Sequence, residues 1–178
     1  MPHITVLDQS TINKIAAGEV IERPSSVVKE LLENAIDAQA TAVTVEIRDG
    51  GISYIRVTDN GCGIPKEEVP LAFLRHSTSK IKSVEDLFTV SSLGFRGEAL
   101  SSIASVAQVE LITKTSEQLS GTRYQIEGGV ERSYEEVGAP DGTTFLVRNL
   151  FYNTPARQKF LKTAQTEGSH VAALVEKI

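Results

Sequence analysis

The sequence predicts an α+β fold in which helices cover one face of a mixed, mostly antiparallel sheet. Two observations carry this prediction. Segments rich in β-branched residues follow one another along the chain, and the helical segments are inserted in groups instead of after every strand. A doubly wound parallel sheet would need a crossover helix between successive strands. The order of elements therefore favours a two-layer sandwich of sheet and helices.

The clearest element is an amphipathic helix over residues 26–38. It follows a weaker helical segment at residues 11–17, and Pro24 is placed where a helix accepts proline in its first turn. Its apolar residues fall within one broad side at the helical period. They are Val27, Val28, Leu31, Leu32, Ala35, Ile36 and Ala38. We expect this side to face the sheet.

The predicted strands form two groups separated by a mixed stretch. Residues 42–48 and 54–59 read as a hairpin around Asp49-Gly50-Gly51, and later strands are expected at 109–113, 122–127 and 143–148. The stretch between the groups comprises a short helix after Pro65, a polar segment at 76–82, a capped turn from Ser83 to Asp86 and a helix at 97–106. Two further helices are expected at 155–162 and 168–178.

Composition excludes several classes of function. The 178 residues, 40% of them hydrophobic, suit one domain spanning residues 1–178, and without a signal sequence or long apolar run we expect a soluble, cytosolic protein. A single cysteine, Cys62, excludes an internal disulfide, and His3, His76 and His170 lack the spacing of zinc ligands. The formal charge of −5 argues against a surface that holds nucleic acid by electrostatics alone.

The first candidate site lies on one edge of the amphipathic helix. Glu30, Asn34 and Asp37 share a stripe beside its apolar side. A carboxylate and a carboxamide one turn apart can activate a water molecule and bind a hard cation such as Mg²⁺. By itself, the same spacing is also that of an ordinary solvated helix edge.

The second candidate directly follows a predicted strand. Asp59 can accept a hydrogen bond from an amine such as that of adenine, while Gly61 and Gly63 would let a flat ring approach the backbone. Alone, this pattern is most often that of a plain turn.

The third candidate is the glycine-rich run at residues 94–100, which leads into a helix. Backbone N–H groups at a helix start bind anions, so a polyphosphate could lie there although the sequence contains no P-loop motif. Its alternative is a hinge that caps a core helix. The hydroxyls and lysine of residues 75–80 would also suit phosphate oxygens, although such polar runs are commonly surface loops.

The order of these motifs, followed by Gly142-Thr143-Thr144 at the start of a strand, resembles the four ATP-site motifs of the gyrase, chaperone, histidine-kinase and MutL ATPase superfamily. More specifically, the runs at residues 13–24, 94–104 and 149–157 resemble signatures of MutL-type DNA mismatch-repair proteins nearly word for word. The resemblance covers essentially the whole chain. It implies a Bergerat-type ATP-binding fold that uses ATP and Mg²⁺.

The resemblance also implies roles for individual residues. Glu30 would be the general base for the attacking water, Asn34 the magnesium ligand and Asp59 the reader of adenine, with Gly61 and Gly63 beside the base. Thr143 would support the adenine end, and Asp37 would have a structural or water-holding role. Thr78, Ser79 and Lys80 would belong to a mobile lid, and Gly94, Arg96, Gly97, Glu98, Ala99 and Leu100 to the phosphate cradle.

At the level of the whole protein, the resemblance implies an ATPase switch. ATP would order the lid, two copies would pair, and hydrolysis would reset the state in response to a mismatch-recognition protein of the MutS type, with DNA bound through the full-length protein. The lysine-supplying second domain and the C-terminal dimerisation region of such proteins are absent from these 178 residues, so weak or negligible turnover by a nucleotide-binding module is the alternative. The resemblance places the protein in the cytoplasm of a bacterium or the nucleus of a eukaryote. A histidine kinase is disfavoured because no helix pair precedes Glu30.

Overall fold

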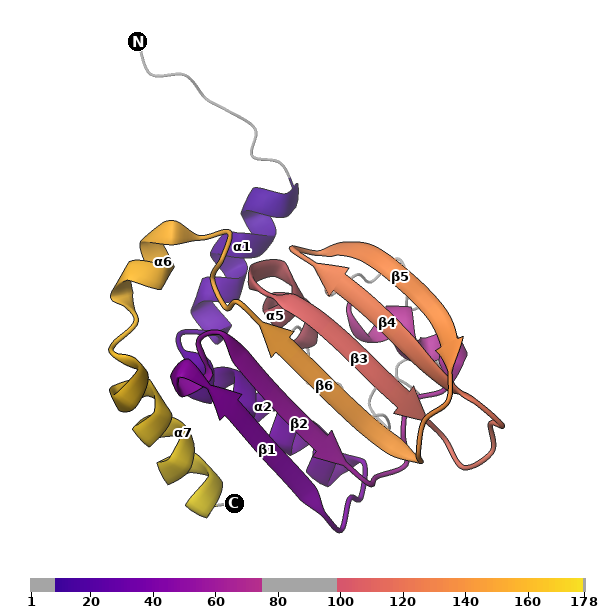
Figure 1. Cartoon of the computed structure of the whole chain (residues 1–178). Helices are drawn as coiled ribbons and strands as arrows, with labels where there is room; N and C mark the ends of the chain where they lie inside the picture. The colour runs from indigo at the N-terminus through magenta and orange to yellow at the C-terminus, as the bar shows by residue number, and fades with distance from the viewer. Residues whose placement is uncertain (1–8, 75–98, 178) are drawn as a thin grey trace.

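The computed structural model describes residues 9–74 and 99–177, which form one sheet layer and one helix layer (Figure 1). The sheet has six strands in the order β1-β2-β6-β3-β4-β5, and every pairing among them is antiparallel. The strands are β1 (Val43–Arg48), β2 (Tyr54–Asp59), β3 (Gln108–Lys114), β4 (Gly121–Glu127), β5 (Val130–Val137) and β6 (Gly142–Arg148). The α+β prediction is confirmed.

Helices α1, α2 and α5 cover one face of the sheet, while α6 and α7 run beside its β1 edge (Figure 1). The helices are α1 (Gln9–Val20), α2 (Pro24–Asp37), α3 (Val69–Ala72), α5 (Ala99–Val106), α6 (Pro155–Phe160) and α7 (Ala164–Lys177), with short 3-10 turns η1 (Asp49–Gly51) and η2 (Lys66–Glu68). In the described parts of the chain, no helix is both long and apolar enough to span a membrane.

The core lies between α2, α5 and the sheet. Helix α2 buries five residues of its apolar side, as the pattern predicts: Val27, Val28, Leu31, Leu32 and Ala35. The prediction was wrong for Ile36, which is 55% exposed, and Ala38 is only partly buried. Ile36 lies at the rim of the apolar arc, where the sheet no longer reaches, so its place on the same side of the helical wheel did not bury it.

Strand β5 is the one strand of the described sheet that the sequence analysis missed. Its outer edge is unpaired, and most of its side chains are exposed, three of them glutamates: Glu131, Glu135 and Glu136. An edge strand packs little apolar surface, and charges on it discourage pairing with another chain. Such a strand lacks the alternation of apolar residues by which strands are predicted.

Several boundaries also differ from the predictions. Helix α1 continues through Gly18 to Val20, α7 begins at Ala164 instead of residue 168, and η1 fills the predicted hairpin turn. The capped turn predicted at Ser83–Asp86 lies outside the described residues.

Strand order decides which polar residues meet. Because β6 lies between β2 and β3, the register pairs Thr143 with Asp59 on one side and with Thr113 on the other. Three residues that are far apart in the sequence thus form a row across neighbouring strands, at the end of the sheet that also lies near the C-terminus of α2.

Candidate nucleotide-binding site

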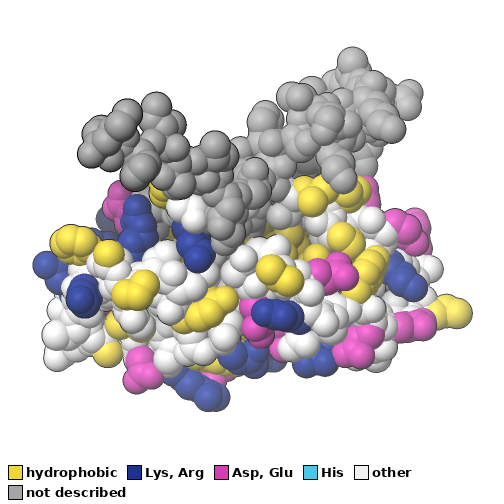
Figure 2. Space-filling view, turned by 90° about the horizontal axis from the view of Figure 1, so that it is seen from above, with side chains coloured by type: hydrophobic (Ala, Val, Ile, Leu, Met, Phe, Trp, Pro, Cys, Tyr) yellow, Lys and Arg dark blue, Asp and Glu magenta, His cyan; other side chains and the backbone are white. Residues whose placement is uncertain are grey.

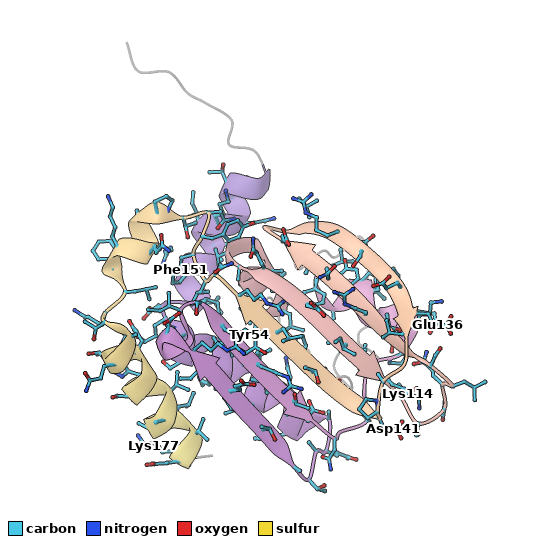
Figure 3. The ribbon with its side chains drawn as sticks, viewed as in Figure 1. Tyr54, Lys114, Glu136, Asp141, Phe151 and Lys177 are labelled. Carbon is cyan, nitrogen blue, oxygen red and sulfur yellow. The ribbon has the colours of Figure 1, made fainter. Side chains whose placement is uncertain are left out.

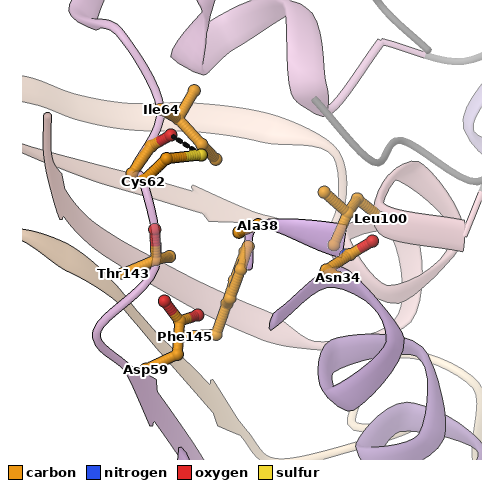
Figure 4. A pocket seen from close by; sticks show the side chains of 9 residues that line it. Asn34, Ala38, Asp59, Cys62, Ile64, Leu100, Thr143 and Phe145 are labelled. Carbon is orange, nitrogen blue, oxygen red and sulfur yellow. Dashed lines mark hydrogen bonds between the residues drawn. The ribbon is translucent and has the colours of Figure 1, made fainter. Parts of the chain in front are cut away.

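A pocket of about 360 Å³, counting the space open to solvent at its mouth, lies between α2, the start of α5 and the sheet. Figure 4 shows Asn34 and Leu100 on one side of it and Asp59 and Thr143 on the other. The lining residues are Asn34, Ala38, Asp59, Cys62, Gly63, Ile64, Leu100, Thr143 and Phe145. Five of them were predicted site residues: Asn34, Asp59, Gly63, Leu100 and Thr143.

Asp59, the last residue of β2, presents a buried carboxylate to this pocket. The residue is 9% exposed, and Oδ1 accepts the backbone N–H of Gly61 at 2.8 Å. Burial raises the pKa of Asp59 above its ordinary value, although hydrogen bonds from the backbone N–H groups of Gly61 and Thr143 oppose the shift. The carboxylate thus retains acceptor capacity for an amine in the pocket.

The glycine loop after β2 fits closely against its surroundings. A side chain on Gly63, whose φ is +73°, would place Cβ 2.1 Å from the carbonyl oxygen of Lys114, so no other residue fits without moving backbone. Gly61 does not line the pocket, and a Cβ there would lie 2.7 Å from the carbonyl oxygen of Ala38. The two glycines therefore serve close packing of the loop against α2 and β3, which shapes the pocket wall.

A buried hydroxyl, that of Thr113, joins three segments of this wall. Its Oγ1 accepts the N–H of Ile64 at 2.9 Å, donates to the carbonyl oxygen of Gly142 at 3.0 Å and lies 2.9 Å from Oγ1 of Thr143. Thr113 is 1% exposed. At the same end of the sheet, Lys114 and Asp141 form an ion pair with 2.7 Å between Nζ and Oδ1 (Figure 3).

Asn34 supplies the polar group on the helix side of the pocket. Its Oδ1 atom is buried and has no hydrogen-bond partner among the described residues. A buried carbonyl oxygen left without a partner is costly, so one aimed at a pocket is a site for a ligand's donor or a cation. Amide oxygens are among the ligands that Mg²⁺ accepts, so this atom fits a magnesium site.

Glu30 and Asp37, the neighbours of Asn34 on the same helix edge, are both partly buried but do not line the pocket. Glu30 lies one helical turn before Asn34, and Asp37 lies at the last position of α2. In the described ranges 9–74 and 99–177, no three His, Cys, Asp or Glu side chains are grouped closely enough to hold a metal.

Helix α5 begins at the pocket, with Ala99 and Leu100 both buried in its first turn. Leu100 lines the pocket and Ala99 does not. The remaining predicted lid and cradle residues lie outside the described residues: Thr78, Ser79, Lys80, Gly94, Arg96, Gly97 and Glu98. His76 lies outside them too.

Sequence analysis did not assign four lining residues: Ala38, Cys62, Ile64 and Phe145. Cys62 and Ile64 belong to the same loop as Asp59, and Phe145 lies two residues after Thr143 on one strand face, so the motif and the strand period could have indicated them. Ala38 and the supporting Thr113 carry no such signal, because only the packing of α2 and β3 brings them to the pocket.

Comparisons with known proteins agree with this geometry. Residues 21–141 match the family described as histidine kinase-, DNA gyrase B-, and HSP90-like ATPase. Among curated proteins, the DNA mismatch repair protein MutL of Agathobacter rectalis is 71% identical over all 178 residues, and that of Caldanaerobacter subterraneus is 53% identical. The chain spans 28% and 30%, respectively, of the length of these two relatives.

A solved structure of the Aquifex aeolicus MutL ATPase domain complexed with ADP is 38% identical and superposes with a TM-score of 0.69. The match covers 89% of this chain and 55% of that one. A second structure, described as the N-terminal domain of a DNA repair protein, is 35% identical, with a TM-score of 0.74 over 94% of this chain and 48% of the other.

Proposed function

Because the chain belongs to the histidine kinase-, DNA gyrase B- and HSP90-like ATPase family, as a MutL-type ATPase domain, we propose that it uses Mg²⁺-dependent binding and hydrolysis of ATP as a switch in DNA mismatch repair. The observation that carries the proposal is the pocket itself. It joins a buried carboxylate on one wall to an unpartnered amide oxygen on the other, at Asp59 and Asn34.

The adenine end of the nucleotide is proposed to lie against Asp59. An exocyclic amine would donate to the carboxylate, and Thr143 and Gly63 would border the base. Gly61, which lies outside the pocket lining, would orient the carboxylate through its N–H. A buried, charge-assisted hydrogen bond of this kind discriminates strongly, since a base with a carbonyl in that position would leave two acceptors facing each other.

The phosphates are proposed to extend past Leu100 toward the start of α5, where the N–H groups of a helix terminus favour anions. Gly94, Arg96, Gly97, Glu98 and Ala99 would complete this cradle, and Thr78, Ser79 and Lys80 would close over it as a lid. Mg²⁺ held by Asn34 Oδ1 and phosphate oxygens would neutralise charge on the phosphates.

Hydrolysis is assigned to the edge of α2. Glu30, one turn from Asn34, would remove a proton from the attacking water, and Asp37 would help to hold that water or the end of the helix. A general base must lie beside the attacking water but need not contact the nucleotide. The place of Glu30 outside the pocket lining is compatible with that role.

For the whole protein, we propose that ATP orders the lid, two copies pair, and the paired state passes a signal from a MutS-type mismatch-recognition protein to DNA held by the full-length protein, in the bacterial cytoplasm. The bacterial MutL relatives support this. The second candidate is nucleotide binding with negligible turnover by the 178 residues alone, since this chain spans less than a third of those relatives.

Calorimetry with ATP tests the nucleotide site directly. ATP with Mg²⁺ should bind, GTP with Mg²⁺ should bind more weakly, and chelating Mg²⁺ should weaken ATP binding. Asn34→Ala should abolish most of the Mg²⁺ dependence, while Asp141→Asn, a change in an ion pair outside the pocket lining, should bind like the original. Equal affinity for ATP and GTP, or Mg²⁺ dependence that survives Asn34→Ala, would contradict the assignment.

A further inference from the structure

The hydroxyl of Thr113 has a single proton and three polar neighbours, and this determines how its hydrogen bonds are directed. The Ile64 N–H can only donate to it, and the Gly142 carbonyl oxygen can only accept from it. Thr113 therefore donates its one hydroxyl proton to the carbonyl oxygen of Gly142. The contact of 2.9 Å with Thr143 is then satisfied only if the Thr143 hydroxyl donates.

In this arrangement, the Thr143 hydroxyl donates its own proton to Oγ1 of Thr113. Its hydroxyl proton points away from the pocket toward Thr113, and its lone pairs remain available on the pocket side. The neighbouring carboxylate of Asp59 is likewise an acceptor when ionised. The wall therefore presents two acceptors side by side, because β6 pairs Thr143 directly with Asp59.

We propose that Thr113 is a positioning residue that holds the Thr143 hydroxyl as an acceptor and thereby helps the pocket to select a base edge carrying an amino group. The inference rests on the proposed nucleotide site and adds a residue that does not itself line the pocket. Without Thr113, the Thr143 hydroxyl can turn and donate its proton to a carbonyl on the base, so part of the discrimination is lost.

The experiment compares ADP with inosine diphosphate, which carries a carbonyl oxygen where ADP carries the amino group. Affinities of both, with Mg²⁺, are measured by calorimetry for the 178-residue chain and its variants. Thr113→Val should lower the preference for ADP over inosine diphosphate about tenfold, the effect of one hydrogen bond. Thr113→Ser, which keeps the hydroxyl, should retain the original preference.

Thr122→Val is the matched control. Thr122 pairs with Thr113 in the sheet, is equally buried at 1% exposure and does not line the pocket. The same hydroxyl-to-methyl change there should leave the preference intact. In a Thr143→Val background, Thr113→Val should produce no further loss, because the acceptor that it positions is gone. If Thr113→Val does not fold, Thr113→Ala removes the same hydroxyl and carries the same expectation.

A merely structural role for Thr113 gives a different result. Both affinities would then fall by the same factor and their ratio would stay unchanged, which would overturn the inference, as would an equal change of ratio in Thr122→Val. If the original chain bound neither nucleotide, the proposed site would fail and this inference with it. If Thr113→Val still binds ADP but prefers it less strongly over inosine diphosphate, only the proposed acceptor role of Thr143 accounts for the result.

Discussion

At the level of single residues, the buried carboxyl group of Asp59, which we propose as the acceptor for the adenine amine, is unfavourable for stability. Burial raises its pKa, and hydrogen bonds from Gly61 and Thr143 reduce the shift without abolishing it. A carboxyl group whose pKa is higher in the folded state contributes most to stability below its unfolded pKa, and that contribution is lost as the pH rises through the folded value. Above the ordinary pKa of an aspartate, this carboxyl group is therefore unfavourable for the stability of the ligand-free protein.

Asp59→Asn tests whether the carboxyl group favours ligand binding while it lowers stability. The substitution removes the buried charge and keeps an oxygen that can accept the Gly61 N–H. We expect the melting temperature of the ligand-free protein at neutral pH to stay the same or rise, while ADP affinity falls about tenfold or more. Thermal melts with and without ADP measure both quantities. An unchanged ADP affinity would show that Asp59 does not bind the base. A lower melting temperature of the ligand-free variant would show that the buried charge does not destabilise the protein.

Gly63 illustrates a constraint on the backbone, and Gly129 provides its control. Both have positive φ, +73° and +83°, but a Cβ on Gly63 would lie 2.1 Å from the Lys114 carbonyl oxygen whereas one on Gly129 would meet nothing within 4 Å. Gly129→Ala should lower the free energy of unfolding by ~1–2 kcal/mol through conformational strain alone. Gly63→Ala should lower it by a further ~1–3 kcal/mol through the clash. Equal losses in denaturant titrations would contradict the close approach.

At the level of elements, helix α2 combines a packing face with the edge on which the proposed catalytic and magnesium-binding residues lie. Five apolar side chains bury one side of it against the sheet, and the edge beside them carries Glu30, Asn34 and Asp37. Because helix residues four apart lie on the same side, the packing that orients α2 also determines where these polar groups lie.

Two substitutions on this edge should have opposite kinetic signatures. In a chain extended to the length of the MutL relatives, Glu30→Ala should reduce ATP turnover ~10²–10⁴-fold with nearly unchanged affinity, because a general base acts in the transition state. Asn34→Ala should instead weaken Mg²⁺-dependent binding itself. Steady-state kinetics and calorimetry on both variants separate the effects. Original turnover in Glu30→Ala, or an affinity loss as large as that of Asn34→Ala, would refute the division of roles.

Helices α1 and α6 meet at a glycine. A Cβ on Gly18 would lie 1.5 Å from Nη2 of Arg157, so the guanidinium group occupies the space that a side chain would need. The two motifs that contain these residues lie near opposite ends of the sequence and are in contact in the fold. Helix α1 in turn packs against α5, whose first turn borders the pocket.

A double-mutant cycle tests this contact. In an Arg157→Ala background, Gly18→Ala should stabilise the protein by ~0.5–1 kcal/mol, because alanine is the better helix former and the space is then free. In the original chain, the same substitution must displace the arginine and should stabilise less or destabilise. Urea titrations of the four proteins give the coupling energy. Identical effects of Gly18→Ala in both backgrounds would show that Arg157 does not pack on Gly18.

At the scale of the whole molecule, the sheet has one face under helices and one open face crossed by ion pairs. On the open face, the carboxylate of Glu110 in β3 lies 2.9 Å from the guanidinium group of Arg123 and 3.4 Å from that of Arg148. The ring of Tyr54, labelled in Figure 3, contacts the guanidinium groups of Arg48 and Arg148. In the view of Figure 2, basic and acidic side chains are likewise interspersed.

The Glu110 network makes stability depend on pH. Burial raises the pKa of Glu110, but the hydrogen bonds and charges of Arg123 and Arg148 outweigh burial and the net shift is downward. A lowered folded-state pKa stabilises the protein above the ordinary glutamate pKa, and that contribution is lost as the pH falls through the folded value. Glu110→Gln should therefore lower the free energy of unfolding at neutral pH by ~1–3 kcal/mol, and the difference should shrink in acid.

Glu127→Gln is the control for this prediction, because its ion pair with Arg132 is exposed and 3.7 Å long. Its effect should stay below ~1 kcal/mol. Denaturant titrations across the acid range measure both variants. A Glu110→Gln difference that is independent of pH, or no larger than that of Glu127→Gln, would mean that the network adds nothing beyond a surface ion pair.

Local sequence patterns correctly predict the class of the fold and also mark several residues of the candidate pocket. The apolar period indicates α2, and β-branched runs indicate five of the six strands of the described sheet. The motif order indicates Asn34, Asp59 and Thr143, which line the pocket. These signals are local, since helix and strand periods and glycine-rich turns are written in neighbouring residues. The missed strand β5 lacks such a signal because an edge strand buries little apolar surface.

Which of these residues meet depends on how the strands and helices pack. The insertion of β6 between β2 and β3 places Thr143 between Asp59 and Thr113, and no feature of the sequence around Thr113 indicates that contact. Packing likewise exposed Ile36, which the helical wheel placed with the core. The physical reason is the same in both cases: strand order and helix docking depend on the summed burial of the whole chain, whereas a sequence pattern reports only the preferences of its own segment.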